Sequence, residues 1–215
     1  MNNKEYIIWI RHPKTAGTSI RTYFLNPENL PKEENKGIFY TNDGEYLIQL
    51  TNWYAMHNKK IEKNKVICVH TRFINDFIEK YESIWENSYK FFISRNPYDR
   101  FVSSWKAVDP TRKIKFTDMC NYNYNLLNTQ QYYHIKTPQT HNIIENNVIF
   151  DYIVNFENLE EDFYDLLDLI NIPKYKLPYV NKTNHKNYEH YYNETLKDFV
   201  YNEFKDDFDY FEYKK

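Results

Sequence analysis

Residues 5–19 read EYIIWIRHPKTAGTS, and this stretch decides the fold. Its first half, Glu5–Arg11, is a short apolar run rich in β-formers, which is typical of a buried strand. A His-Pro dipeptide then ends the run, so the chain has to turn. Thr18 and Ser19 can cap a helix that we expect to reach about Leu25. The opening unit is therefore predicted as a strand, a tight loop and the start of a helix.

The loop of this unit has the composition of an anion site: Lys14, Thr15, Ala16, Gly17, Thr18 and Ser19. Free amides and the positive dipole at a helix start favour a phosphate or sulfate, and a glycine lets backbone approach it. Lys14 adds a point charge aimed at the same place. Taken alone, the loop also fits an ordinary turn with an exposed lysine. An ATPase loop would read GxxxxGK[ST], whereas this lysine precedes the glycine by three residues.

Further along the chain, strand-like and helical patterns alternate. The strand-like runs are Lys65–His70, Tyr89–Arg95 and Asp151–Phe156, and the helical ones are Phe73–Tyr81, Pro97–Val108, Glu157–Ile170 and Thr195–Phe204. A hairpin is expected around residues 42–44. Alternation of this kind predicts an α/β fold with a mostly parallel sheet and a ligand site at the carboxyl ends of its strands. The length of the polypeptide suits one domain over residues 1–215.

A second basic motif, RNPYDRFVSSW, follows the run that ends at Arg95. Arg95 leaves the strand tip, Pro97 starts a helix, and Ser103 lies about two turns along it. Arg95 and Ser103 could therefore flank one phosphate beside the first loop. For Arg100, a surface ion pair or a structural role is the simpler interpretation.

Composition excludes several classes of protein. Lysine and arginine total 28 against 30 acidic residues, so the net charge of −2 provides no global field for nucleic acid. Cys68 and Cys120 lack the spacing of a zinc site and cannot build a disulfide framework, so we expect two free thiols. No carboxylate cluster predicts a metal site. The N-terminal residues resemble neither a signal peptide nor a membrane span, which predicts a soluble, cytoplasmic protein.

The two motifs together resemble those of the carbohydrate sulfotransferases that use 3'-phosphoadenosine-5'-phosphosulfate (PAPS). PKTAGTS follows the first strand, and RxPxxRxxSxW follows a later one. Three later stretches are also similar to family segments: DYIVNFENLEEDF at 151–163, LPYVNKTNH at 177–185 and DFDYFEY at 207–213. In the last of these, Glu212 stands where the family has glycine. The resemblance, from about Ile8 to Tyr213, implies a P-loop-like three-layer α/β sandwich.

The resemblance also implies roles around the donor. The first motif would bind the 5'-phosphosulfate, with Lys14 stabilising charge on the bridging oxygen. Arg95 and Ser103 would bind the 3'-phosphate, and Lys182 with Thr183 would close over the nucleotide. His70 ends a strand near the loop, and its ordinary pKa suits it as the base that takes the acceptor's proton. A strand-end histidine held by backbone groups is the alternative, and His12 is a weaker candidate for the base.

The acceptor is expected to be a carbohydrate or another molecule that bears a hydroxyl. Arg72, Gln139 and His141 are assigned to its side of the site, against an even alternative of surface residues without a role. Trp105 is expected to pack in the core and not to stack on adenine. Two other functions stay open: a P-loop-type small-molecule kinase, which needs a magnesium carboxylate that no strand end here provides, and a noncatalytic glycan or nucleotide binding module. Oligomeric state is not predicted.

Overall fold

A computed structural model of the chain describes residues 4–24, 47–50, 66–109, 111, 113–178 and 187–215. The strands are β1 Tyr6–Arg11, β2 Leu47–Leu50, β3 Val66–His70, β4 Ser88–Ser94 and β5 Tyr152–Asn155. The α-helices are α1 Gly17–Phe24, α3 Ile74–Glu86, α4 Pro97–Val108, α5 Thr129–Lys136, α6 Leu159–Leu169, α7 Glu194–Glu203 and α8 Lys205–Tyr210. Short 3-10 helices are η2 Thr71–Phe73, η3 Phe116–Asn121, η4 Tyr124–Leu126, η5 Phe156–Asn158 and η6 Tyr188–Tyr191. The predicted hairpin at 42–44 lies outside the described residues.

The sheet is parallel, and β1 occupies its centre. The strand order is β2-β3-β1-β4-β5, and neighbouring strands pair in parallel throughout. Trp9 of β1 is in register with Cys68 of β3 on one side and Phe91 of β4 on the other. A central parallel strand is buried on both faces, which explains why β1 reads as a continuous apolar run. The predicted α/β fold with a parallel sheet is confirmed.

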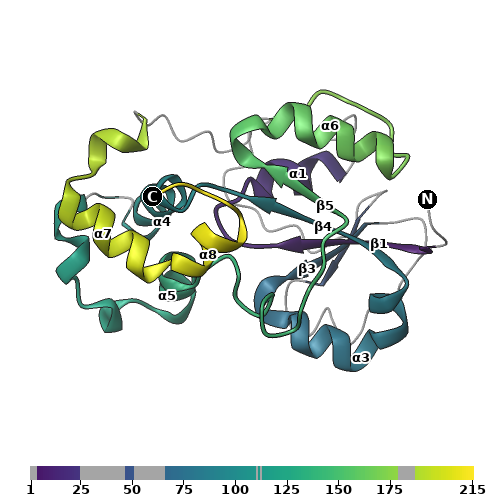
Figure 1. The fold of residues 1–215 in the computed structure, drawn as a ribbon, viewed down its shortest axis with the longest axis horizontal. Helices are drawn as coiled ribbons and strands as arrows, with labels where there is room; N and C mark the ends of the chain where they lie inside the picture. Colours follow the sequence, from purple (N-terminus) through teal and green to yellow (C-terminus); the bar gives the residue numbers. More distant parts are fainter. Residues whose placement is uncertain (1–3, 25–46, 51–65, 110, 112, 179–186) are drawn as a thin grey trace.

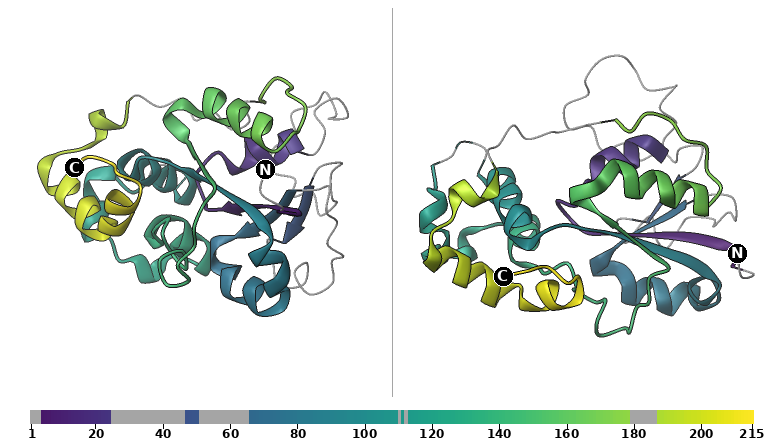
Figure 2. Two further views of the ribbon diagram at one scale, coloured as in Figure 1. Left: turned by 45° about the vertical axis from the view of Figure 1, so that its right-hand side comes forward. Right: turned by 45° about the horizontal axis from the view of Figure 1, so that its top comes forward.

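Helices cover both faces of the sheet (Figures 1 and 2). Alternate residues of β1 point to opposite faces. Trp9 packs toward α1 and α6, where its ring stacks on that of Phe91 with centroids 6.3 Å apart. Ile8 and Ile10 pack on the other face with Phe77 of α3. Burial of these apolar side chains contributes about 1.5–3 kcal/mol each, so two hydrophobic layers hold the three-layer arrangement.

A group of helices stands beyond the carboxyl ends of the strands (Figure 1). It contains α4, α5, α7 and α8, and its own core is aromatic, with Phe101, Phe116 and Phe204 among its buried members. Trp105 is 7% exposed, and its indole N–H donates to the Ile114 carbonyl at 2.9 Å. Trp105 therefore packs in this core as expected. The helical group forms a wall opposite the strand ends, where the sequence places the site.

Most element boundaries agree with the sequence analysis, and the exceptions have physical causes. Helix α4 has the predicted bounds. Helix α3 continues to Glu86 beyond the predicted end at Tyr81, where the backbone leaves the helical region at φ −130° before the helix resumes. Residues 156–158 form a 3-10 turn, so α6 begins at Leu159 instead of Glu157. Strand β2 and helices α5 and α8 were not predicted.

Candidate active site

The loop after β1 has an unusual backbone. Lys14 and Ala16 both adopt left-handed conformations, with φ of 70° and 59°. The Thr15 hydroxyl between them donates to the His12 carbonyl at 2.9 Å. Left-handed residues in such a turn direct successive N–H groups to one concave side, which is a shape that binds anions. The strain of about 1–3 kcal/mol for each such residue fits a functional loop.

Gly17 leaves room for a neighbouring side chain where this loop enters α1. A Cβ on Gly17 would lie 2.5 Å from Nε of Arg11. The Arg11 side chain therefore lies against the backbone of the helix start, in the space that the missing Cβ leaves free. As a result, Arg11 adds positive charge beside the loop.

Lys14 is partly buried among other cations. Burial, together with Arg95 and Arg11, lowers the pKa of its ammonium to about 8. Keeping the ammonium charged in the empty site costs free energy. A bound anion supplies the missing counter-charge and so stabilises the protonated lysine. Lys14 is therefore suited to bind a negatively charged group.

Arg95, at the end of β4, meets the first loop. Its Nη1 donates to the Lys14 carbonyl at 2.8 Å, and its Nε and Nη2 donate to one Asp99 oxygen at 2.9 and 2.7 Å. Ser103, further along α4, is buried with 3% of its surface exposed. Because β1 and β4 are neighbours in the sheet, the two motifs that the sequence singled out lie together.

His70 occupies the end of β3, the other neighbour of β1. Its side chain is 7% exposed. Burial, followed by the charges of Arg11 and Arg72, lowers its pKa well below 6.5, so the imidazole is neutral at neutral pH. A neutral imidazole can accept a proton. Its Nδ1 accepts a long bond of 3.4 Å from the Arg72 backbone, the interaction that the alternative interpretation requires.

The three residues assigned to the acceptor side have different environments. Arg72 is exposed, with its guanidinium 5.4 Å from the centroid of the Tyr133 ring, and the half-buried His141 ring lies 5.8 Å from the same ring. Gln139 is fully buried, and its amide bonds both the N–H and the carbonyl of Arg95. Gln139 thus supports Arg95, while Arg72 and His141 surround Tyr133. Lys182 and Thr183 lie outside the described residues.

The family model described as "Sulfotransferase family" matches residues 1–214. The chain belongs to the sulfotransferase family. Membership supports transfer of a sulfuryl group to a hydroxyl-bearing acceptor in general. Among curated proteins no match was found. A solved structure, described as a sulfotransferase from Alicyclobacillus acidocaldarius, aligns over 98% of this chain and 97% of its own with a TM-score of 0.50. At 10% identity this likeness concerns the fold alone.

Four polar residues near the sulfotransferase motifs were missed by sequence reasoning: Thr71, Tyr133, His134 and Asp207. Thr71 and Tyr133 share a hydrogen bond of 2.7 Å. Asp207 is fully buried on α8 and accepts from the backbone N–H groups of Gln139 and Thr140, both at 2.9 Å. The only signal in the sequence was the position of Asp207 in the terminal DFDYFEY stretch, which gave no role for it.

The fully buried Arg100 connects Asp207 to the first loop. Nη2 of Arg100 lies 3.8 Å from Oδ2 of Asp207, within ion-pair distance. Nη1 of Arg100 donates to the His134 carbonyl at 3.4 Å and to Nε2 of His12 at 3.5 Å. The structural interpretation of Arg100 is therefore correct, although its partner is buried and not at the surface. Asp207 supplies the counter-charge for a cation that would otherwise be costly to bury.

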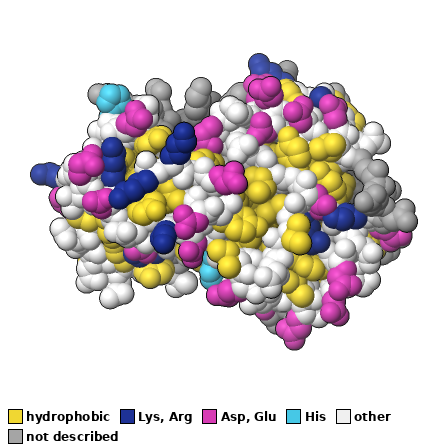
Figure 3. Space-filling model, in the orientation of Figure 1, with side chains coloured by type: hydrophobic (Ala, Val, Ile, Leu, Met, Phe, Trp, Pro, Cys, Tyr) yellow, Lys and Arg dark blue, Asp and Glu magenta, His cyan; other side chains and the backbone are white. Residues whose placement is uncertain are grey.

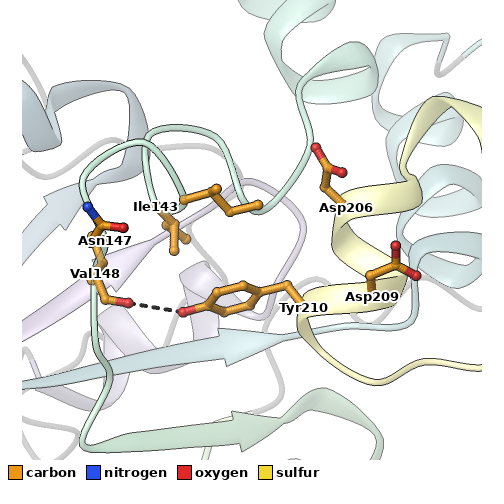
Figure 4. Close-up of a pocket in the computed structure, with 7 residues that line it drawn as sticks. Ile143, Asn147, Val148, Asp206, Asp209 and Tyr210 are labelled. Atoms are coloured by element: carbon orange, nitrogen blue, oxygen red, sulfur yellow. Dashed lines mark hydrogen bonds between the residues drawn. The ribbon is translucent and has the colours of Figure 1, made fainter.

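A surface pocket of about 400 Å³ lies on the outer side of α8, between Asp206, Asp209 and Tyr210 and the loop that carries Ile143 and Val148 (Figure 4). The Tyr210 hydroxyl donates across it to the Val148 carbonyl at 3.0 Å. The residues that line it are different from those of the two sulfotransferase motifs. Helix α8 thus presents Asp207 to the buried network, and Asp206 and Asp209 to solvent.

The rest of the described molecule gives no competing site of another class. Acidic and basic side chains are interspersed on the face drawn in Figure 3, in keeping with the small net charge. In the described ranges no three His, Cys, Asp or Glu residues are placed to hold a metal ion. None of the helices described is long and apolar enough to cross a bilayer. Cys68 and Cys120 are both free thiols, as expected.

Proposed function

We propose that this protein transfers a sulfuryl group from PAPS to a hydroxyl of a carbohydrate. The observation that carries the proposal is the Arg95–Lys14 contact, which joins the two anion motifs at the ends of neighbouring strands. His70 stands at the end of the strand on the opposite side of β1. The two anion motifs and the candidate base thus lie along one edge of the sheet, as expected for a parallel α/β fold.

For the donor, the first loop holds the phosphosulfate end and the second motif holds the 3'-phosphate. Backbone N–H groups of residues 15–19 bind terminal oxygens, together with the hydroxyls of Thr18 and Ser19. Arg95 uses three of its five N–H groups on Asp99 and Lys14 within the described residues, so two are left for a phosphate beside Ser103. Lys182 and Thr183 complete this assignment by resemblance to the family.

PAPS supplies an activated sulfuryl group that passes in line to the acceptor oxygen while the bond to the phosphate oxygen breaks. The Lys14 ammonium stabilises the negative charge that the departing phosphate oxygen gains. The neutral His70 imidazole takes the proton of the attacking hydroxyl. Arg72 and His141 border the partly exposed Tyr133 ring, a polar and aromatic surface suited to a sugar.

Isothermal titration with adenosine 3',5'-bisphosphate, with ATP as the control ligand, tests the donor. The expected result is binding of the bisphosphate at least about tenfold tighter than of ATP, because the loop and Arg95 accept two separated phosphates. Preference for ATP would instead favour the small-molecule kinase. No binding of either nucleotide would refute PAPS as the donor.

His70→Ala tests the base. This variant is expected to bind the bisphosphate as the wild type does and to lose at least about a hundredfold in transfer rate. Because the pKa of His70 is lowered, the wild-type rate should fall only at a pH below the ordinary histidine range. His190→Ala, which changes an exposed histidine, is the matched control. Unchanged transfer in His70→Ala would remove His70 from this role.

A further inference from the structure

Tyr133 lies at the meeting point of the residues assigned to the base and the acceptor. It belongs to α5, and its ring centroid is 5.2 Å from that of His70 and 5.9 Å from that of His12. The side chain is partly exposed, so it can touch a ligand. The hydrogen bonds of its hydroxyl determine whether that hydroxyl can donate a further hydrogen bond to such a ligand.

The protonation state of His12 determines which groups donate in the hydrogen bonds that lead to Tyr133. Arginine only donates, so Nε2 of His12 accepts from Arg100 at 3.5 Å. The imidazole is fully buried beside that guanidinium, and both burial and the charge lower its pKa well below 6.5. His12 is therefore neutral with its proton on Nδ1, which lies 3.0 Å from the Thr71 hydroxyl oxygen. Thus His12 donates to Thr71.

Thr71 lies between His12 and Tyr133 and connects them by hydrogen bonds of its hydroxyl. The side-chain partners of its hydroxyl among the described residues are His12 and Tyr133. Thr71 is fully buried, and a buried hydroxyl proton without an acceptor is costly. Since His12 is a donor to the Thr71 oxygen, the Thr71 proton goes to the Tyr133 oxygen at 2.7 Å. With its oxygen accepting from Thr71, the Tyr133 hydroxyl still has its own proton to donate.

Arg100, the residue that donates to His12, is held in place by buried polar contacts. Arg100 is fully buried with Asp207, and Asp207 is itself bonded by the Thr140 N–H at 2.9 Å and by the Thr140 hydroxyl at 3.0 Å. Buried hydrogen bonds and ion pairs of this kind restrain the orientation of the side chains that they join. The ring of His12 and the hydroxyl of Thr71 therefore have one orientation, and the Tyr133 proton is directed away from them.

We propose that Tyr133 positions the acceptor, because its hydroxyl donates a hydrogen bond to a carbohydrate oxygen next to the hydroxyl that reacts. This inference rests on the proposed function. Tyr133 stays protonated throughout, since burial raises its pKa to about 12. Its hydroxyl is an oriented donor and not a base, so it complements His70. The bond would align the attacking hydroxyl between His70 and the donor.

The test uses binding of 4-nitrophenyl β-D-glucopyranoside to the full chain saturated with adenosine 3',5'-bisphosphate, followed by transfer from PAPS to the same glucoside. Tyr133→Phe is expected to weaken glucoside binding and to lower kcat/KM for it about tenfold, with unchanged affinity for the bisphosphate. Tyr132→Phe changes the adjacent tyrosine, which is 42% exposed, and should behave as the wild type.

Thr71 provides a second line of test. Thr71→Val should cause a similar loss and add little to Tyr133→Phe in the double variant, because both act through one hydrogen bond. Thr71→Ser keeps the hydroxyl and should restore most of the loss. In protein labelled with ¹⁵N-histidine, the shifts of His12 should report a protonated Nδ1 and an unprotonated Nε2.

The outcomes separate this inference from the proposed function. Wild-type protein that does not bind the bisphosphate refutes the proposed donor, and the assignment of Tyr133 is lost with it. Wild-type protein that binds the bisphosphate but not the glucoside overturns the carbohydrate acceptor and the Tyr133 assignment together. Equal glucoside binding and turnover in wild type and Tyr133→Phe overturn the Tyr133 assignment alone, and leave the donor and His70 in place.

Discussion

Single residues of the first loop combine backbone strain with an unfavourable charge. Lys14 has a left-handed backbone, its carbonyl accepts from Arg95, and its ammonium is kept near other cations. The strained backbone and the crowded ammonium cost free energy in the empty protein, and an anion offsets the crowding of positive charge. The loop is thus better suited to the bound state than to the free state.

Binding of adenosine 3',5'-bisphosphate should depend on pH through Lys14. The protonated ammonium attracts phosphate, and its pKa in the free protein is about 8. Affinity should therefore weaken as the pH rises through about 8, whereas the phosphates, with a second pKa of about 6, keep their charge. Titration calorimetry from about pH 7 to about pH 9 measures this change. Lys14→Met is the control, and the same pH dependence in that variant would contradict the assignment.

Sequence reasoning identified residues whose surroundings are local and missed those defined by distant partners. Lys14 and Gly17 could be identified from the local sequence, because they lie in a short loop between a predicted strand and a predicted helix. Tyr133 is 62 residues from Thr71, and Asp207 is 67 from Thr140, so neither contact leaves a pattern in the chain. Gln139 was assigned to the acceptor side by resemblance, and in the structure its side-chain amide bonds the backbone of Arg95.

At the scale of elements, strands buried on both faces were predictable because their apolar runs are continuous. Helix α4 was predictable as well, since Asn96 caps it and Pro97 occupies its first turn. Helix α5 has a mixed polar face, and only Ile135 of it is fully buried, so its pattern gives no clear period. Helix α8 has only six residues, too few to show one.

Helix α8 offers a matched pair of carboxylates for a stability measurement. Asp207→Asn removes the counter-charge of the buried Arg100 and should cost about 3–5 kcal/mol of unfolding free energy. Asp206→Asn, one position earlier and exposed, should change it by less than about 0.5 kcal/mol. Urea unfolding monitored by circular dichroism compares them. Similar midpoints for the two variants would show that the buried network does not stabilise the fold.

The whole molecule is expected to unfold as one cooperative unit. Although the helical group beyond the strand ends has its own aromatic core, Phe208 packs in that core while Tyr210 and Phe211 pack against the sheet beside Phe92. Residues of α8 and the turn after it thus belong to both cores. Thermal melting followed in the far and near ultraviolet should give coincident transitions. Two separate transitions would instead indicate two domains.

The central position of β1 has a consequence for biogenesis. This strand leaves the ribosome before either of its partners, β3 and β4, and parallel pairing over such separations is slow. Both anion motifs stay apart until β4 docks, and Arg100 has no counter-charge until the ribosome has added Asp207. A nascent chain should therefore acquire nucleotide affinity late, which makes ligand retention on stalled chains a readout of when co-translational folding is complete.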